Sequence, residues 1–246
     1  MDERSDIEPV ITNHKAWRPQ AAAIIVAAGQ GTRMGADIPD KIWTELAGVP
    51  VILHAIRAFH NTPCIDAIVL VLREERIDRA RRIIADEGMT KVVDIRVGGV
   101  RRQDSVRAGL DSLQGRGCDV VLIHDGARPL VDAEMIERGV EFGRKHGAAV
   151  AAIPVVDTIK QVDSEGGVVG TPRRAELLAV QTPQAFNIDL LLRAYVEGDV
   201  DVTDDAMLVE RLGHRVWTFP GSRRNLKITT PEDLIIAAAF LAVTSA

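Results

Sequence analysis

A glycine-rich loop that ends in two cations is the part of this chain best suited to chemistry. It lies within residues 22–41, AAIIVAAGQGTRMGADIPDK, and contributes Gly29, Gly31, Gly35, Arg33 and Lys41. Glycines allow phosphate oxygens to approach the backbone N–H groups closely, and the two cations supply the opposite charge. The segment therefore predicts a binding site for a triphosphate.

The spacing of this loop excludes the two common phosphate-binding fingerprints. A dinucleotide-binding G-x-G-x-x-G motif would need glycine where Met34 stands, and a P-loop starting at Gly29 would need Gly-Lys at positions 34 and 35. A nicotinamide dehydrogenase is further disfavoured, because no acidic residue ends a second strand about twenty residues beyond the glycines. The kind of site therefore depends on residues elsewhere in the chain.

Three other segments carry chemically useful side chains at or near the carboxyl ends of predicted strands. They are VGGVRRQDSVRAGL at 97–110 with Gly99 and Ser105, LIHDGARP at 122–129 with His124, Asp125 and Arg128, and RRNLKITTPEDL at 223–234 with Lys227. Taken singly, each has a plainer interpretation: a turn, a structural Asp–Arg pair beside a structural histidine, and a solvated lysine. In a parallel sheet, however, the carboxyl ends of the strands meet at one edge, where ligands bind. We therefore expect these side chains to converge with the glycine loop.

Strand and helix patterns alternate along the chain as far as Pro154. Apolar runs of strand length occupy 22–27, 65–72, 91–97, 119–123 and 148–153, and helical patterns occupy 50–60, 74–87, 102–114 and 132–146. This alternation predicts an α/β fold with a Rossmann-like, mostly parallel sheet and helices on both faces. Farther along, the patterns predict helices at 188–197 and 203–212, strands at 214–219 and 224–228, and a last helix that Thr230 caps.

Two segments depart from this alternation. Residues 1–20 are polar and aperiodic, so we expect a flexible extension before a single domain over 21–246. Residues 155–180 alternate weakly around a Gly166-Gly167 turn signal, which predicts a protruding β-arm. Because such an arm buries little surface alone, we expect a partner subunit to cover it in a homodimer.

Composition limits the classes of partner. The chain has 246 residues and a net charge of −5, which gives no general attraction to nucleic acid or to an anionic membrane. The longest apolar run, LIIAAAFLAV, has about half the length that a bilayer span requires. Cys64 and Cys118 lack metal-ligand spacing, and the acidic N-terminus MDERSDIEPV does not resemble a signal peptide, so we expect a cytoplasmic protein.

A series of motifs occurs together and in order along residues 21–240. They are AAGQGTRMG, Lys41 with ELAGVPVI, GGVRRQDSV at 98–106, HDGARP, DTIK at 157–160, TPQAF at 182–186, TDDA at 203–206 and NLKITTPEDL. This series resembles the 2-C-methyl-D-erythritol 4-phosphate cytidylyltransferase family. The resemblance implies transfer of CMP from CTP to that polyol phosphate, with release of diphosphate, in non-mevalonate isoprenoid precursor synthesis.

The same resemblance implies roles for three groups of residues. The catalytic group would be Arg33, Lys41, Lys227 and Asp125. The nucleotide-binding group would be Ala27, Ala28, Gly29, Gly31, Arg33, Lys41, Gly99, Ser105 and Asp125, and the acceptor-binding group Asp125, Arg128, Thr158, Arg174, Thr203 and Lys227. Mg²⁺ or another divalent cation would be held mainly by the CTP phosphates, with Asp125 as a candidate ligand. Exchange of arms in a homodimer would bring Thr158 and Arg174 to the neighbouring site.

Three residues depart from the family's usual pattern, of which Gly126, in place of a commoner alanine, is a minor change. Asp40 separates Pro39 from Lys41 where most members read Pro-Lys, and Val100 stands where many members have an acidic or small polar residue. A related D-ribitol 5-phosphate cytidylyltransferase is an alternative, because two polyol phosphates differ by few contacts. A non-catalytic, nucleotide-binding regulatory protein is an alternative of another class.

Overall fold

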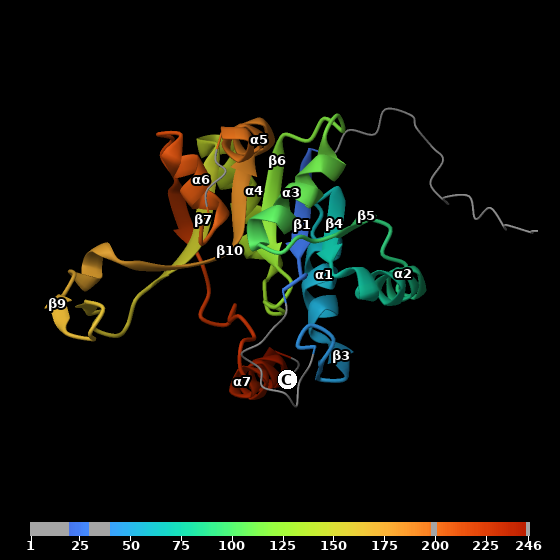
Figure 1. The fold of residues 1–246 in the computed structure, drawn as a ribbon. Helices are drawn as coiled ribbons and strands as arrows, with labels where there is room; N and C mark the ends of the chain where they lie inside the picture. Colours follow the sequence, from blue (N-terminus) through green and yellow to red (C-terminus); the bar gives the residue numbers. More distant parts are fainter. Residues whose placement is uncertain (1–19, 30–39, 198–200, 245–246) are drawn as a thin grey trace, which may run out of the picture.

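A seven-stranded sheet forms the centre of the fold, with strand order β11-β7-β10-β6-β1-β4-β5 (Figure 1). The computed structural model describes residues 20–29, 40–197 and 201–244, so the predicted extension before Gln20 and the loop residues Gly31, Arg33 and Gly35 lie outside the described residues. The strands are β1 Ala21–Val26, β4 Ala67–Leu72, β5 Val92–Val97, β6 Val120–Asp125, β7 Ala148–Pro154, β10 Leu178–Asn187 and β11 Trp217–Pro220.

Neighbouring strands of this sheet run parallel except at β10, which is antiparallel to both β6 and β7. The predicted α/β fold with a mostly parallel sheet is therefore confirmed. The last residue of β1, Val26, lies opposite Val71 of β4 and Asp125 of β6. The carboxyl ends of the three central strands are thus level, and the residues that follow them share one edge of the sheet.

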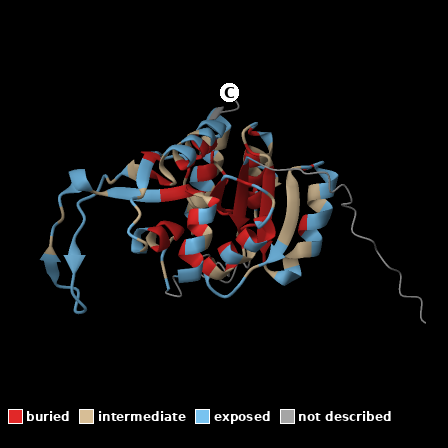
Figure 2. Ribbon diagram, turned by 90° about the horizontal axis from the view of Figure 1, so that it is seen from above, coloured by how far each residue is buried: buried red, intermediate tan, exposed pale blue. Residues whose placement is uncertain are grey.

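Helices cover both faces of the sheet, as predicted. On one face lie α1 Val51–Asn61, α2 Ile77–Asp86 and α4 Ala133–His146, and on the other α3 Arg102–Leu113, α5 Ile188–Glu197 and α6 Asp205–Arg211. Because alternate residues of a strand point to opposite faces, Ile25 joins the first core and Ile24 the second. The central strands are therefore buried on both sides, which explains why their sequences are continuously apolar (Figure 2).

Two smaller pieces extend from this core. The hairpin of β2 Glu45–Leu46 and β3 Val49–Pro50 lies beside the last helix, α7 Pro231–Thr244, around a small apolar cluster. The arm leaves the sheet between β7 and β10 and carries a hairpin of β8 Gln161–Val162 and β9 Val168–Gly170, followed by the short helix η3 Arg174–Glu176. Nearly every residue of the arm is exposed (Figure 2). No helix of the described residues is long and apolar enough to cross a membrane.

The strand predicted at 224–228 is wrong. Residues 225–229 lie outside helix and strand. The Ile228 N–H donates a hydrogen bond to the Ala127 carbonyl at 2.8 Å, but the segment forms no strand ladder. The helix predicted at 203–212 begins two residues later at Asp205, because the Asp204 carboxylate caps it by accepting a hydrogen bond from the Met207 N–H.

Strand β10 is absent from the predicted elements, and Pro183 explains why. Proline lacks the N–H that a strand ladder needs, so a proline in the middle of a segment argues against a strand there. In the structure the pairing of β10 with β7 is interrupted between Val180 and Gln184, and Pro183 falls in that interruption. The predicted helix at 74–87 likewise divides into η2 Glu74–Arg76 and α2.

We predict that Gly109→Ala lowers the free energy of unfolding by about 1 kcal/mol. A Cβ at Gly109 would lie 2.5 Å from Cγ2 of the fully buried Ile24, so α3 could no longer approach β1 as closely. Overpacking costs about 1–3 kcal/mol, which exceeds the gain of about 1 kcal/mol in helix propensity. Urea unfolding measures the change, and the same substitution in an Ile24→Ala background serves as the control. A stabilising effect in the unmodified background would contradict the prediction.

Candidate active site

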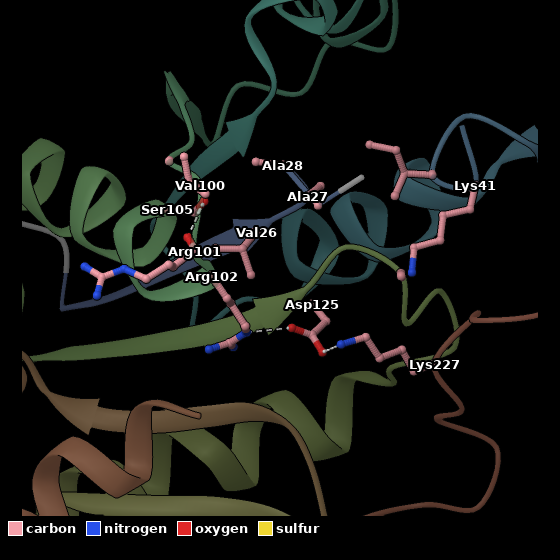
Figure 3. Close-up of a pocket in the computed structure, with 14 residues that line it drawn as sticks. Val26, Ala27, Ala28, Lys41, Val100, Arg101, Arg102, Ser105, Asp125 and Lys227 are labelled. Carbon is pink, nitrogen blue, oxygen red and sulfur yellow. Dashed lines mark hydrogen bonds and ion pairs between the residues drawn. The ribbon is translucent and has the colours of Figure 1, made fainter. Parts of the chain in front are cut away.

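A pocket opens at the carboxyl ends of the central strands, and all four segments selected from the sequence contribute to it (Figure 3). This first pocket contains eight of the predicted site residues: Ala27, Ala28, Gly29, Lys41, Gly99, Ser105, Asp125 and Lys227. The expected convergence is therefore observed for the described residues. The two remaining loop residues, Gly31 and Arg33, lie outside them.

Small residues allow the segment after β1 to lie against the start of α3. A Cβ at Gly98 would lie 2.3 Å from the Ala28 Cβ and 2.7 Å from the Ser105 Oγ, so this position has no room for a side chain. A Cβ at Gly99 would meet the Asp104 Cβ at 2.3 Å. Both glycines are thus required by the packing of the protein on itself, and they leave one wall of the first pocket made of backbone and small side chains.

Lys227 does not lie in the predicted strand. A buried asparagine fixes the position of the segment that carries it. Asn225 is fully buried, its Nδ2 donates to the Thr182 carbonyl at 2.8 Å, and its own carbonyl accepts from Arg128 Nη1 at 2.8 Å. Residues 225–229 are therefore tied both to β10 and to the loop after β6. The Lys41 Nζ donates to the Ile228 carbonyl at 3.1 Å, which brings both lysines to one wall of the first pocket.

The additional acidic residue beside Lys41 does not line this pocket. Asp40 Oδ2 lies 2.6 Å from Arg76 Nε and 3.8 Å from Arg73 Nη2, at the turn that precedes α2. Burial raises the pKa of the Asp40 carboxyl, and the charges of Arg76 and Arg73 oppose that rise. Arginines outside the first pocket therefore compensate this carboxylate.

Three cations surround the carboxylate of Asp125. Its Oδ2 lies 2.7 Å from Lys227 Nζ and its Oδ1 accepts from Arg102 Nε at 3.2 Å, so the two cations approach the carboxylate from opposite sides (Figure 3). Arg128 Nε lies 3.8 Å from the same Oδ2. Burial alone would raise the pKa of Asp125, but Arg102, Lys227 and Arg128 outweigh it and hold that pKa well below its usual range.

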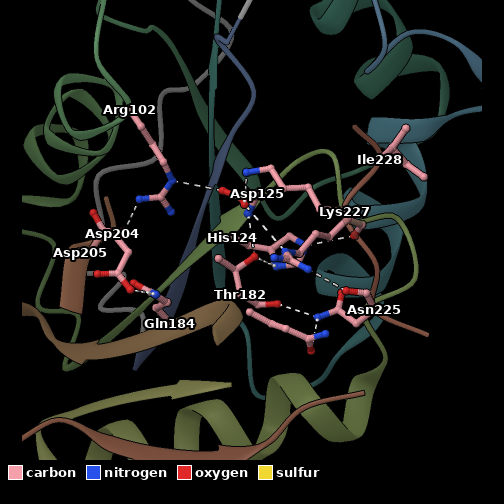
Figure 4. A network of polar contacts seen from close by, with 12 residues as sticks. Arg102, His124, Asp125, Thr182, Gln184, Asp204, Asp205, Asn225, Lys227 and Ile228 are labelled. Atoms are coloured by element: carbon pink, nitrogen blue, oxygen red, sulfur yellow. Dashed lines mark hydrogen bonds and ion pairs between the residues drawn. The ribbon is translucent and has the colours of Figure 1, made fainter. Parts of the chain in front are cut away.

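A second pocket adjoins the first on the side of β10 and α6. Figure 4 shows several of its side chains, among them Arg102, Gln184 and Lys227. Its wall is strongly polar and includes Arg102, Asp125, Arg128, Gln181, Thr182, Gln184, Thr203, Asp204 and Lys227. Arg102, Asp125 and Lys227 also line the first pocket. Two ligands bound side by side would therefore meet at one carboxylate and its two flanking cations.

Comparison with known proteins identifies the family. The family model for IspD, 2-C-methyl-D-erythritol 4-phosphate cytidylyltransferase, matches residues 21–243. Relatives that bear this enzyme name in Dehalococcoides mccartyi (strain CBDB1) and Alkaliphilus oremlandii are 45% and 44% identical, over 90% of this chain and 96% and 95% of their own. The chain belongs to the 2-C-methyl-D-erythritol 4-phosphate cytidylyltransferase family.

Solved structures of this family agree with the fold. The structure of 4-diphosphocytidyl-2C-methyl-D-erythritol synthase from Anaerococcus prevotii superposes with a TM-score of 0.79 at 32% identity, covering 90% of this chain and 96% of its own. The Thermus thermophilus cytidylyltransferase gives a TM-score of 0.71 at 28% identity, covering 89% and 98%. The likeness extends over nearly the whole length of each chain.

Two residues that the family resemblance assigns to acceptor binding lie apart from both pockets. Thr158 and Arg174 are exposed on the arm, and they line neither the first nor the second pocket. Arg174 Nη1 donates to the Val156 carbonyl at 2.6 Å, a contact within the arm itself. The other acceptor candidates, Arg128 and Thr203, line the second pocket.

Arg102 of α3 lines both pockets, but unlike Ser105 of the same helix it is absent from the site residues predicted from the sequence. Because Arg102 stands next to Arg101, the sequence indicates a pair of solvated arginines in the first turn of a helix. Only the fold brings its guanidinium to Asp125 and, at 2.6 Å, to Asp205. Its position just after a strand end, where three other candidates also lie, is the one signal in the sequence that could have selected it.

His124 is structural, as the sequence suggests. It is fully buried, its Nε2 lies 3.1 Å from the Arg128 carbonyl, and its Nδ1 lies 3.1 Å from Thr182 Oγ1, which in turn accepts from the Asp125 N–H. Burial lowers the pKa of His124 to about 4. The neutral ring therefore supports the end of β6 that carries Asp125.

We predict that His124 makes the protein less stable as the pH falls from 7 to 5.5. The unfolded chain binds a proton near the ordinary histidine pKa of about 6.5, whereas the folded state resists protonation until about pH 4. Stability is therefore fully present above the unfolded pKa and decreases as the pH falls, by about 1 kcal/mol over this interval. Urea unfolding of the wild type and of His124→Gln at both pH values measures this change in the free energy of unfolding. An equal pH slope in the two proteins would contradict the prediction.

Proposed function

We propose that this chain transfers CMP from CTP to 2-C-methyl-D-erythritol 4-phosphate, releasing diphosphate and forming 4-CDP-2-C-methyl-D-erythritol. The observation that carries the proposal is the meeting of two pockets at Arg102, Asp125 and Lys227. A transfer between two phosphorylated substrates needs such an arrangement, because both phosphates have to reach the same cation. The names of the relatives supply the identities of the two substrates.

The chemistry is a direct displacement at phosphorus. An oxygen of the acceptor phosphate attacks the α-phosphorus of CTP and forms a new P–O bond, while the bond to the β-phosphate oxygen breaks and diphosphate leaves with the electron pair. No covalent intermediate with the protein is needed, so catalysis rests on positioning and on stabilisation of negative charge. Lys227, which lines both pockets, is placed to neutralise charge on the transferred group.

The first pocket suits the nucleotide. Lys41, with Arg33 from the same glycine-rich loop, supplies cations for the triphosphate. The wall formed by Ala28, Gly99 and Ser105 offers a flat surface with backbone groups and one hydroxyl, which suits a small pyrimidine ring. Val100 is fully exposed at the rim of the first pocket and supplies only an apolar contact where many members have an acidic or small polar residue.

The donor set of the first pocket fits Mg²⁺ held largely by the substrate. Asp125 is the one carboxylate that lines the described part of this pocket, and the described residues contain no group of three or more His, Cys, Asp or Glu side chains able to hold a metal. Mg²⁺ in nucleotide sites keeps phosphate oxygens and water as most of its ligands, so a single carboxylate suffices. When bound, the ion would offset charge on the triphosphate.

The second pocket suits the acceptor, and the arm completes it from a partner subunit. Arg128, Thr203 and the amides of β10 can bind hydroxyl and phosphate oxygens. On the arm, Val162, Val168 and Val169 are each more than half exposed, a surface that a second copy of the chain would cover. We therefore propose a homodimer in which Thr158 and Arg174 reach the partner's acceptor pocket. Sedimentation equilibrium that finds only monomer at micromolar concentration would refute the dimer.

A cytoplasmic location is consistent with this function. Cys64 and Cys118 are both free thiols, and burial raises the pKa of each. Unpaired thiols are usual in a reducing compartment, where CTP is also available.

The decisive assay measures diphosphate release from CTP with each of two acceptors, 2-C-methyl-D-erythritol 4-phosphate and D-ribitol 5-phosphate. We expect release with the first acceptor, and little with the second or when ATP, GTP or UTP replaces CTP. Preference for ribitol phosphate would identify the related enzyme instead, and no release with either would favour a non-catalytic nucleotide-binding protein.

Lys227→Ala should reduce kcat/KM by about 30- to 1000-fold, which corresponds to a loss of about 2–4 kcal/mol of transition-state stabilisation. The reason is the removal of the cation at the junction of the two pockets. Lys145→Ala, which removes an exposed lysine of α4, is the matched control and should keep wild-type kinetics. Turnover of Lys227→Ala close to that of the control would refute the assigned role.

Arg174→Ala should raise the KM for the acceptor about tenfold and leave the KM for CTP unchanged, because the arm is expected to contact only the acceptor phosphate. Arg173→Ala is the control, since Arg173 is a neighbouring exposed arginine that pairs with Glu176 on the arm itself. Steady-state kinetics with each substrate varied in turn provide the measurement. Equal effects of the two substitutions would contradict the choice of Arg174.

A further inference from the structure

Arg102 uses two different nitrogens to hold two carboxylates. Its Nε donates to Asp125 Oδ1 at 3.2 Å, and its Nη1 donates to Asp205 Oδ2 at 2.6 Å. One carboxylate ends β6 and the other begins α6, so this side chain of α3 joins three elements at the junction of the two pockets (Figure 4). A lysine has one charged nitrogen and cannot reproduce such a fork.

Asp205 is placed to hold Arg102 and not to meet a ligand. Its exposed fraction is 1%, and it lines neither the first nor the second pocket. Its second oxygen, Oδ1, accepts a hydrogen bond from Tyr195 Oη at 2.5 Å, and Tyr195 is itself buried on α5. A buried carboxylate is stable only when it is paired and hydrogen-bonded, so Asp205 keeps Arg102 in place whether or not substrate is bound.

Asp125 has a different kind of partner on its other oxygen. Lys227 Nζ lies 2.7 Å from Oδ2, and the side chain of Lys227 is about one-third exposed, at 34%, toward the space where the substrates meet. A phosphate that binds Lys227 competes with Asp125 for the same ammonium group. If Lys227 were its sole partner, Asp125 would then be a buried and uncompensated carboxylate, which is strongly unfavourable.

The other nearby cation does not replace Arg102. Arg128 Nε lies 3.8 Å from Asp125 Oδ2, and its Nη1 is committed to the Asn225 carbonyl at 2.8 Å. Oδ1 of Asp125 therefore depends on Arg102.

We propose that Arg102 is a positioning residue of the transfer reaction: held by Asp205 and Tyr195, it keeps Asp125 compensated and in place while Lys227 engages phosphate. This inference rests on the proposed function, because it requires phosphates to arrive at Lys227 from either pocket. It assigns to α3, α5 and α6 a role in the reaction that extends beyond covering one face of the sheet.

The first test compares Arg102→Lys with Arg107→Lys, which changes an exposed arginine on the same helix. Arg102→Lys keeps the positive charge but cannot donate from two separate nitrogens to the two carboxylates. We therefore expect kcat to fall at least about tenfold and the KM for the acceptor to rise about threefold or more. Arg107→Lys should stay within about twofold of wild type. A purely structural role would lower the amount of active enzyme, so that kcat falls while both KM values stay unchanged, and that result would overturn the proposal.

The second test uses Tyr195→Phe, which keeps the buried ring and removes only the hydroxyl that holds Asp205. We expect kcat of the folded variant to fall about three- to tenfold, and the melting temperature to fall as well, because Asp205 Oδ1 loses a buried hydrogen bond. This variant decides the question even if Arg102→Lys fails to fold. Kinetics equal to wild type in Tyr195→Phe, or equal to the Arg107→Lys control in Arg102→Lys, would overturn the role of Arg102. Failure of the wild-type enzyme to release diphosphate would overturn the proposed function instead.

Discussion

The rest of the site depends on one constraint, the cost of burying the Asp125 carboxylate at the end of β6. A desolvated carboxylate persists in its charged form only when cations surround it. Here the cations come from three separate segments: Arg102 begins α3, Arg128 follows β6, and Lys227 lies in the irregular segment before α7. The interactions that stabilise Asp125 thus also fix the positions of the groups that phosphates would meet, so the fold and the preorganisation of the site have the same physical origin.

Much of the fold could be predicted because it depends on local patterns. The central strands are continuously apolar, and the helices between them carry their own capping residues, such as Asp132 at the start of α4. The failures occur where tertiary contacts override the local pattern. Pro183 argues against a strand where β10 lies, although this proline falls where the ladder between β10 and β7 is interrupted. The alternating residues around Lys227 resemble a strand, but their backbone groups bond to Ala127 and Lys41 instead.

The candidate site could be predicted to the extent that its residues follow strand ends. Asp125 and Ser105 meet that rule, whereas Lys227 lies in an irregular segment, and the first pocket contains all three. Arg102 meets it as well, yet an arginine beside a second arginine carries no local sign of burial. Its partner Asp205 is more than a hundred residues away, so the pairing exists only once α3 and α6 pack on the same face of the sheet. Sequence reasoning identifies chemical groups more readily than the contacts that hold them.

The treatment of Asp40 follows the same logic as that of Asp125. A carboxylate next to Lys41 would weaken phosphate binding if its charge faced the pocket, because like charges repel over several ångströms in a medium of low dielectric. Arg76 and Arg73 prevent this by holding Asp40 outside the first pocket, just as Arg102 and Arg128 lie beside Asp125. Asp40 and Asp125 are thereby both paired with arginines, so neither carboxylate depends on a lysine alone for its compensation.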